Sequence, residues 1–154
     1  PRGNYKAAMA GFNYRMTELQ AAVGIAQLKK LKFILKENKK RFNQLEKALK
    51  NKTYLRKIYP GSVPSYDTFL FKVKKNKKKT IVKYLNKVGI GTKNLPDAIK
   101  WHFAFYWKHA ISKNQLKNTY KSKKILENYI AVPILLKKSV SFYREISQNL
   151  AYFL

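Results

Sequence analysis

The 154-residue sequence contains no cysteine. Disulfide bonds, zinc sites built on thiolates and cysteine nucleophiles are therefore excluded, and cysteine usage gives no indication of the redox compartment. Histidine is almost as scarce, since His102 and His109 are the only two in the chain. The sequence places no third metal ligand beside them, so we expect no metal site.

Long hydrophobic runs are also missing, because lysine and asparagine interrupt every apolar stretch well short of the roughly 18 residues that a membrane-spanning helix requires. We therefore expect neither a transmembrane helix nor a signal peptide. The chain is nonetheless 45% apolar and 14% aromatic. That content is enough to bury a core in a chain of this length, so the sequence predicts a folded protein.

Acidic residues are the third scarcity. The sequence contains seven Asp and Glu residues and 34 Lys and Arg residues, so its formal net charge is +27. Such a charge attracts polyanions, and Tyr and Phe interleaved with Lys in residues 66–75 are candidate stacking platforms for nucleic acid. However, only five of the basic residues are Arg, and the lysines are spread along the whole chain. A basic α/β nucleic-acid-binding module is therefore kept as the alternative function.

A long helix is predicted over residues 17–51. Thr17 followed three residues later by Gln20 is a capping-box pattern, in which each side chain accepts a hydrogen bond from a backbone N–H at the helix start. Apolar residues then recur with helical spacing at Leu28, Leu31, Leu35, Phe42, Leu45 and Leu49. Neither Gly nor Pro interrupts residues 25–51, so a single helix of about 30 residues, long enough to link two domains, is expected.

A smaller α/β unit is predicted over residues 60–154, after a cluster of turn-forming residues at 59–65. The patterns predict strands at 66–73, 90–93 and 130–134, and helices at 78–87, 114–129 and 140–150. In the first strand Phe69, Phe71 and Val73 share one face. Gly89 is expected to end the first helix, and residues 74–79 are interpreted as a solvated, hairpin-like turn. The fold class is α/β, with this unit packed beside the long helix.

Two segments carry candidate binding residues. Asn13, Tyr14 and Arg15 precede the long helix, whose unpaired N–H groups and partial positive charge favour an anion. The simpler alternative is a loop in which Asn13 and Arg15 bond only backbone carbonyls. Between residues 101 and 109 lie both tryptophans and both histidines of the chain. A histidine among aromatic side chains is more often a packed core residue than a catalytic one.

The residues from Gly11 to Leu28, GFNYRMTELQAAVGIAQL, resemble the segment that closes the active site in sugar aminotransferases of the DegT/StrS type, which use pyridoxal phosphate. The late run Ala131-Val132-Pro133-Ile134 matches the family's apolar-Pro-apolar strand, so the resemblance covers nearly the whole chain. It implies the carboxyl-terminal portion of a fold-type I enzyme. Residues 1–16 would be an active-site loop from the large domain, 17–51 the linking helix and 60–154 the small domain.

The resemblance also implies roles for individual residues. Asn13 matches the asparagine that contacts the cofactor phosphate of the neighbouring subunit in a homodimer, and Tyr14 and Arg15 match positions that shape the same corner. His102 followed four residues later by Tyr106 matches a pattern that faces the sugar substrate. Trp101 is expected to form an aromatic wall of that pocket.

The activity implied by the family is transfer of an amino group from glutamate, through pyridoxal phosphate, to a keto sugar. Residues 95–99 with Trp101 and His102 are similar to the 8-amino-3,8-dideoxy-manno-octulosonate aminotransferase type, but the same scaffold also serves nucleotide-linked sugars. The octulosonate type would imply lipopolysaccharide biosynthesis, and such enzymes are expected in the cytoplasm. No Schiff-base lysine is recognisable, so the chain alone is expected to be inactive; a non-catalytic homologue is a further alternative.

Overall fold

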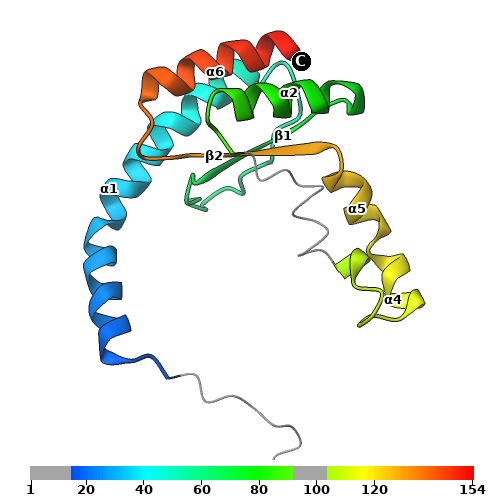
Figure 1. Ribbon diagram of the computed structural model, residues 1–154. Coiled ribbons are helices and arrows are strands. Elements are labelled where there is room, and N and C mark those ends of the chain that lie inside the picture. The colour runs from blue at the N-terminus through cyan, green and yellow to red at the C-terminus, as the bar shows by residue number, and fades with distance from the viewer. Residues whose placement is uncertain (1–14, 92–103) are drawn as a thin grey trace, which may run out of the picture. The chain divides into compact units, whose positions relative to one another are not determined.

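The computed structural model describes residues 15–91 and 104–154 (Figure 1). Contacts divide the chain into two compact units, Pro1–Lys32 and Phe33–Leu154. The fold is α/β, as predicted, and the described elements follow in the order α1 (Glu18–Leu49), β1 (Thr68–Lys72), α2 (Lys75–Lys87), a 3₁₀ turn η1 (Ala104–Tyr106), α4 (Lys113–Asn118), α5 (Tyr120–Leu126), β2 (Tyr129–Pro133) and α6 (Val140–Phe153).

The sheet of the second unit consists of β1 and β2, which pair in antiparallel orientation. Phe69 lies opposite Val132, and both side chains are buried. The predicted alternation along β1 is confirmed, because Phe69, Phe71 and Val73 are buried whereas Leu70 between them is only half-buried. One face of the sheet therefore forms the floor of the hydrophobic core.

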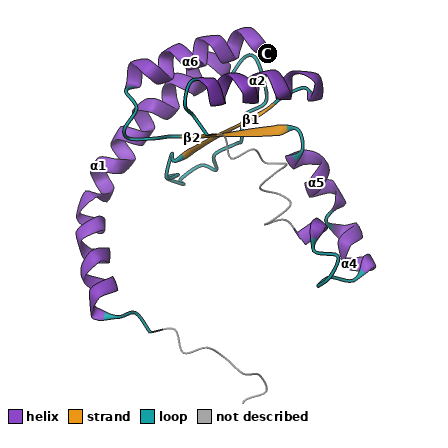
Figure 2. Cartoon of the chain, in the orientation of Figure 1, coloured by secondary structure: helices purple, strands orange, loops and turns teal. Residues whose placement is uncertain are grey.

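Helices α2 and α6 and the second half of α1 cover that face of the sheet (Figures 1 and 2). Each helix contributes fully buried side chains to one cluster with the strands: Leu45 and Leu49 from α1, Ile81 and Leu85 from α2, and Tyr143, Ile146 and Leu150 from α6. The core is thus a helical layer packed on a small sheet.

Tyr143 fixes the connection between β2 and α6. Its ring is buried in the core, and its hydroxyl donates to the carbonyl of Pro133 at 2.9 Å and accepts from the N–H of Leu135 at 2.8 Å. Burial raises the pKa of this phenol above its ordinary value, so the hydroxyl is protonated and able to donate. Ser139 caps α6 by accepting from the N–H of Phe142 at 3.0 Å.

Arg41 fixes the second half of α1 to the same connection. The side chain is buried, and its guanidinium donates to the carbonyls of Lys138 at 2.8 Å and Leu136 at 3.2 Å. A third nitrogen reaches the carboxylate of Glu37 at 2.9 Å. Two of these bonds join α1 to the carbonyls of a segment almost 100 residues later in the chain, which makes this arginine part of the fold.

The prediction of a turn at residues 74–79 is wrong, because α2 already begins at Lys75. The lysines and Asn76 have acceptable helix propensity and lie on the solvent side, while Ile81 and Leu85 face the core. The polar first turns of this helix were therefore misinterpreted as a turn between elements. The predicted end is confirmed: Gly89 has a φ of +74°, the left-handed conformation that closes helices.

The predicted helix at residues 114–129 is two short helices, α4 and α5, with Thr119 between them. The Thr119 hydroxyl donates to the carbonyl of Leu116 at 2.7 Å and ends the first helix. Tyr129 belongs to β2, because it pairs with Lys72 across the sheet. The strand predicted at residues 90–93 does not form at Ile90 or Gly91, and its other residues lie outside the described part.

Candidate functional site

The start of α1 is built as the sequence predicts. The N–H of Thr17 donates to Oε1 of Gln20 at 2.9 Å, and the N–H of Gln20 donates to the Thr17 hydroxyl at 3.3 Å. This capping box is confirmed, and it satisfies two of the N–H groups that a helix start leaves open. Glu18 in the first turn adds a carboxylate that the helix dipole favours.

Arg15 lies two residues before this cap and is exposed. A guanidinium and a helix start each favour a phosphate group, the ligand predicted for the corner at residues 13–15. The other residues predicted for that corner, Asn13 and Tyr14, lie outside the described residues. Arg15 is thus the only residue of this corner that the structure describes, and the phosphate site stays a prediction.

Tyr106 is the one predicted substrate residue that the structure describes. It ends the turn η1, is half-buried, and packs against the neighbouring Phe105 ring at a centroid distance of 5.3 Å with the planes nearly perpendicular. Trp101 and His102 lie outside the described residues. The described structure therefore places Tyr106 in an aromatic corner without testing its predicted neighbours.

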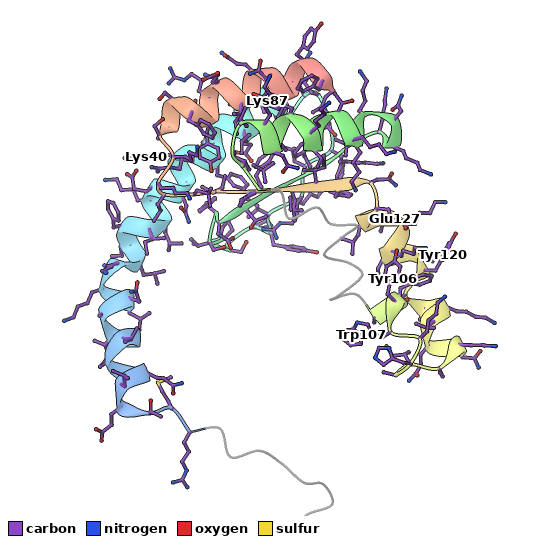
Figure 3. All side chains as sticks on the ribbon, viewed as in Figure 1. Lys40, Lys87, Tyr106, Trp107, Tyr120 and Glu127 are labelled. Carbon is purple, nitrogen blue, oxygen red and sulfur yellow. The ribbon has the colours of Figure 1, made fainter. Side chains whose placement is uncertain are left out.

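Residues of α5 complete this aromatic corner (Figure 3). The ring of Tyr120 lies 6.3 Å from that of Phe105, and the ammonium of Lys123 lies 4.2 Å from the centre of Phe105 and 5.7 Å from that of Tyr106. A cation over an aromatic face is attracted by the electrons of the ring. The corner thus combines apolar ring faces with a fixed positive charge.

A hollow of about 380 Å³ adjoins this corner. Its walls are Phe105, Leu116 and Tyr120, with Lys113 and Lys117 at the edges. The surface of this hollow is almost wholly apolar, so it suits the C–H face of a ring-shaped ligand. Sequence analysis did not find Phe105, Tyr120 or Lys123, because residues of η1 and α5 meet only through the tertiary fold.

The reactive group of a pyridoxal-phosphate enzyme is a lysine, which makes side-chain burial informative among the described residues. Their buried polar and charged residues are Asn38, Arg41 and Ser147, so no lysine of residues 15–91 and 104–154 is buried. A lysine that binds this cofactor covalently needs a low-dielectric pocket. The same segments hold no group of three or more potential metal ligands.

None of the helices in these two segments combines the length and apolar character needed to cross a membrane.

Comparison with known proteins adds a family match. A sequence model of the DegT/DnrJ/EryC1/StrS aminotransferase family matches residues 1–141. A search of curated proteins gave no match.

Several solved structures share the fold. PseC of Helicobacter pylori, an aminotransferase involved in the biosynthesis of pseudoaminic acid, superposes with a TM-score of 0.65 at 22% identity, over 94% of this chain and 39% of PseC. Spr1654 of Streptococcus pneumoniae, described as a sugar aminotransferase and solved in its PLP form, gives 0.66 at 17% identity, over 91% and 37%.

A third relative differs in chemistry. The GDP-4-keto-6-deoxy-D-mannose-3-dehydratase of E. coli, with bound hydrated PLP, gives a TM-score of 0.55 at 24% identity, over 92% of this chain and 38% of that enzyme. The likeness to all three is therefore one of fold, and this chain spans less than half of each relative's length.

Proposed function

Because the chain belongs to the DegT/DnrJ/EryC1/StrS aminotransferase family, we propose that it forms the carboxyl-terminal part of a pyridoxal-phosphate-dependent sugar aminotransferase. Pyridoxal phosphate is the cofactor of this family. The reaction proposed is transfer of an amino group from glutamate to a keto sugar, either nucleotide-linked or of the octulosonate type. The family match over residues 1–141 is the observation that carries this proposal.

Asn13, with Tyr14 and Arg15, is proposed to hold the cofactor phosphate of the partner subunit in a homodimer. The support is the exposed guanidinium of Arg15 directly before the capped start of α1, where donors and the helix dipole favour an anion. When bound, the cofactor would carry the amino group between glutamate and the sugar. These residues would anchor and orient its phosphate end, without taking part in the chemical step.

The substrate side is assigned to Trp101, His102 and Tyr106. Support comes from the aromatic corner, where the half-buried Tyr106 contacts Phe105, and Phe105 lines a hollow of about 380 Å³ together with Tyr120. A sugar ring would pack its C–H face on an aromatic ring while Lys123 and the Tyr106 hydroxyl meet its polar groups. The corner would thus orient the keto sugar.

The chain alone is proposed to be catalytically inert, since no described lysine is buried. Purified chain mixed with pyridoxal phosphate and glutamate should show no amino transfer to the cofactor, measured by the visible absorption of the mixture. Glutamate-dependent conversion of the cofactor by the chain alone would contradict this.

The decisive experiment uses a full-length enzyme that includes this chain. Its bound cofactor should give a visible absorption band that shifts when glutamate is added, and Asn13→Ala should weaken cofactor retention by roughly tenfold or more, as expected for loss of a hydrogen bond to a charged group. Asn43→Ala, an exposed change on α1, is the matched control and should retain the cofactor.

Three results would overturn parts of this assignment. A folded full-length protein without a cofactor band would favour a non-catalytic homologue or the nucleic-acid module. A cofactor band that glutamate does not shift would favour another reaction, such as the dehydration carried out by the E. coli relative. Equal retention of the cofactor by Asn13→Ala and Asn43→Ala would remove the phosphate role of Asn13.

A further inference from the structure

Lysines line a large hollow between α2 and the end of α5, on the unit formed by Phe33–Leu154. The hollow has a volume of about 850 Å³, and its lysines are Lys75, Lys78, Lys79, Lys83 and Lys124. That volume lies within the range of roughly 300–1,000 Å³ that is common for ligand sites. The aminotransferase assignment gives this hollow no role.

Two further hollows continue this one. A hollow of about 390 Å³ shares Lys124 and Asn128 with it and adds Lys72 and Lys121. Another, of about 370 Å³, shares Lys72 and Asn128 with the second and adds Lys74. Because neighbouring hollows have wall residues in common, they adjoin one another, and we call the three together the lysine groove.

Little negative charge balances the lysine groove. Among the residues that line the three hollows, Glu127 is the only one with a carboxylate side chain, and its Oε1 lies 3.6 Å from the ammonium of Lys123. The sequence of α2 itself contains no Asp or Glu. Lys75, Lys79 and Lys83 follow one another at helical spacing i, i+4, so their like charges repel across one face of the helix. A polyanion in the groove would remove this repulsion.

We propose that the lysine groove binds a linear chain of phosphate groups, of the inorganic polyphosphate type. Its extension over three hollows suits a chain of charges better than a single phosphate. Lysine meets phosphate as a point charge without a fixed geometry, whereas the groove lining includes no arginine for bidentate recognition.

A nucleic-acid strand fits the groove less well. Proteins that bind single strands stack successive bases on aromatic side chains. Tyr129 is the only aromatic residue lining the three hollows. The lining therefore offers charges at many points and a ring face at one, which matches a ligand that has phosphates and no bases.

The test compares two triple variants of this chain. Lys75→Gln, Lys79→Gln and Lys83→Gln remove three exposed charges from the lysine groove, and Lys29→Gln, Lys32→Gln and Lys36→Gln remove three exposed charges from α1 outside it. Both sets leave the core untouched and change the net charge equally. Circular dichroism confirms the fold, and isothermal titration calorimetry measures binding of long-chain inorganic polyphosphate, with an oligonucleotide of equal charge as competitor.

The groove variant should bind polyphosphate roughly tenfold more weakly than the parent chain, with a reduced dependence on salt, because fewer counterions are released on binding. The α1 variant should bind within about twofold of the parent, as expected when the lost charges do not line the groove and are screened by salt. Equal losses in both variants would overturn the proposal in favour of general charge attraction. Tighter binding of the oligonucleotide than of polyphosphate would overturn the proposal in favour of a nucleic-acid site. Absence of polyphosphate binding to the parent chain would refute the proposal.

Discussion

The two halves of α1 are built from similar residues and have opposite surroundings. In residues 18–32 the large apolar side chains are exposed, with 76% of Leu19 and 67% of Leu28 accessible to solvent. In residues 33–49 the exposure of apolar side chains falls along the helix: Phe33 is still exposed, Phe42 is half-buried, and Leu45 and Leu49 have no accessible surface. Helical spacing and the Thr17 cap account for one continuous helix, but only its second half gains stability from packing.

Exposed apolar side chains on the first half include Leu19, Val23, Ile25, Leu28 and Leu31. A concentration of this kind on one helix is typical of a surface that another part of a protein covers. This agrees with the proposed role of the chain as part of a longer enzyme, since the relatives in solved structures are more than twice its length.

The largest expected effect is on the free energy of unfolding, which should depend on core packing only in the second half of α1. Leu45→Ala should lower the free energy of unfolding by about 3 kcal/mol, because it opens a cavity in the core, whereas Leu28→Ala should change it by less than about 0.5 kcal/mol. Urea denaturation followed by circular dichroism measures both. Similar losses in the two variants would show that the first half is packed in solution as well.

A second expected effect concerns the polar anchor of the packed half. Arg41→Met should lower the free energy of unfolding by about 2 kcal/mol, because the carbonyls of Leu136 and Lys138 lose their charged donor. Arg144→Met is the control, since Arg144 is exposed and makes a 3.3 Å hydrogen bond to Gln44. In the same denaturation experiment the free energy of unfolding of the control should lie within about 0.5 kcal/mol of the parent value. Equal losses in the two variants would contradict an anchoring role for Arg41.

Removal of a helix cap should have different effects on α6, which is packed in the core, and on the exposed first half of α1. Ser139→Ala should lower the free energy of global unfolding by about 1 kcal/mol, because α6 is part of the core. Thr17→Ala removes an equivalent cap from the first half of α1, so it should speed local amide exchange in residues 21–31 and leave global unfolding unchanged. Hydrogen exchange with residue resolution measures both. A drop in global stability for Thr17→Ala would mean that the two halves unfold as one cooperative unit.

The smallest expected effect depends on pH. Hydrogen bonds from Lys40 and Arg41 lower the pKa of the Glu37 carboxyl below its ordinary value of 4.5. The folded state therefore holds this proton less tightly than the unfolded state, so the stabilisation is present above pH 4.5 and is lost as the pH falls through the lowered pKa. Glu37→Gln should reduce the loss of stability between neutral and acidic pH in urea titrations. An unchanged pH profile would assign that loss to other carboxylates.

The sequence predicted those features that depend on neighbouring residues. The Thr17–Gln20 cap, the alternation around Leu70 and the end of α2 at Gly89 each involve residues within a few positions of one another. The start of α2 was missed because Lys75 and its neighbours look alike in a solvated turn and on the outer face of a helix. Tyr129 was misassigned because its strand exists only through pairing with Lys72.

In the candidate site, too, contacts between residues far apart in the sequence were not predicted. Tyr106 was found through a family pattern, but its contact with Lys123 follows from the packing of η1 against α5, which no local pattern encodes. The roles of Asn13, Tyr14, Trp101 and His102 remain predictions. The lysine groove could not be predicted from the sequence, since Lys121 and Lys124 meet the lysines of residues 72–83 only after the chain folds.

The Tyr143 hydroxyl also bears on the order of folding. Its partners Pro133 and Leu135 are ten and eight residues away, so this corner closes a short loop at little entropic cost. Pairing of Thr68 with Pro133 instead joins distant parts of the chain, and contacts of that kind are slow to form. We therefore expect the corner between β2 and α6 to form early and the sheet to form late. Stopped-flow refolding tests this order. Tyr143→Phe should slow refolding, because its contacts are expected to form before the rate-limiting step. An effect of this substitution on the unfolding rate alone would show that the corner forms late.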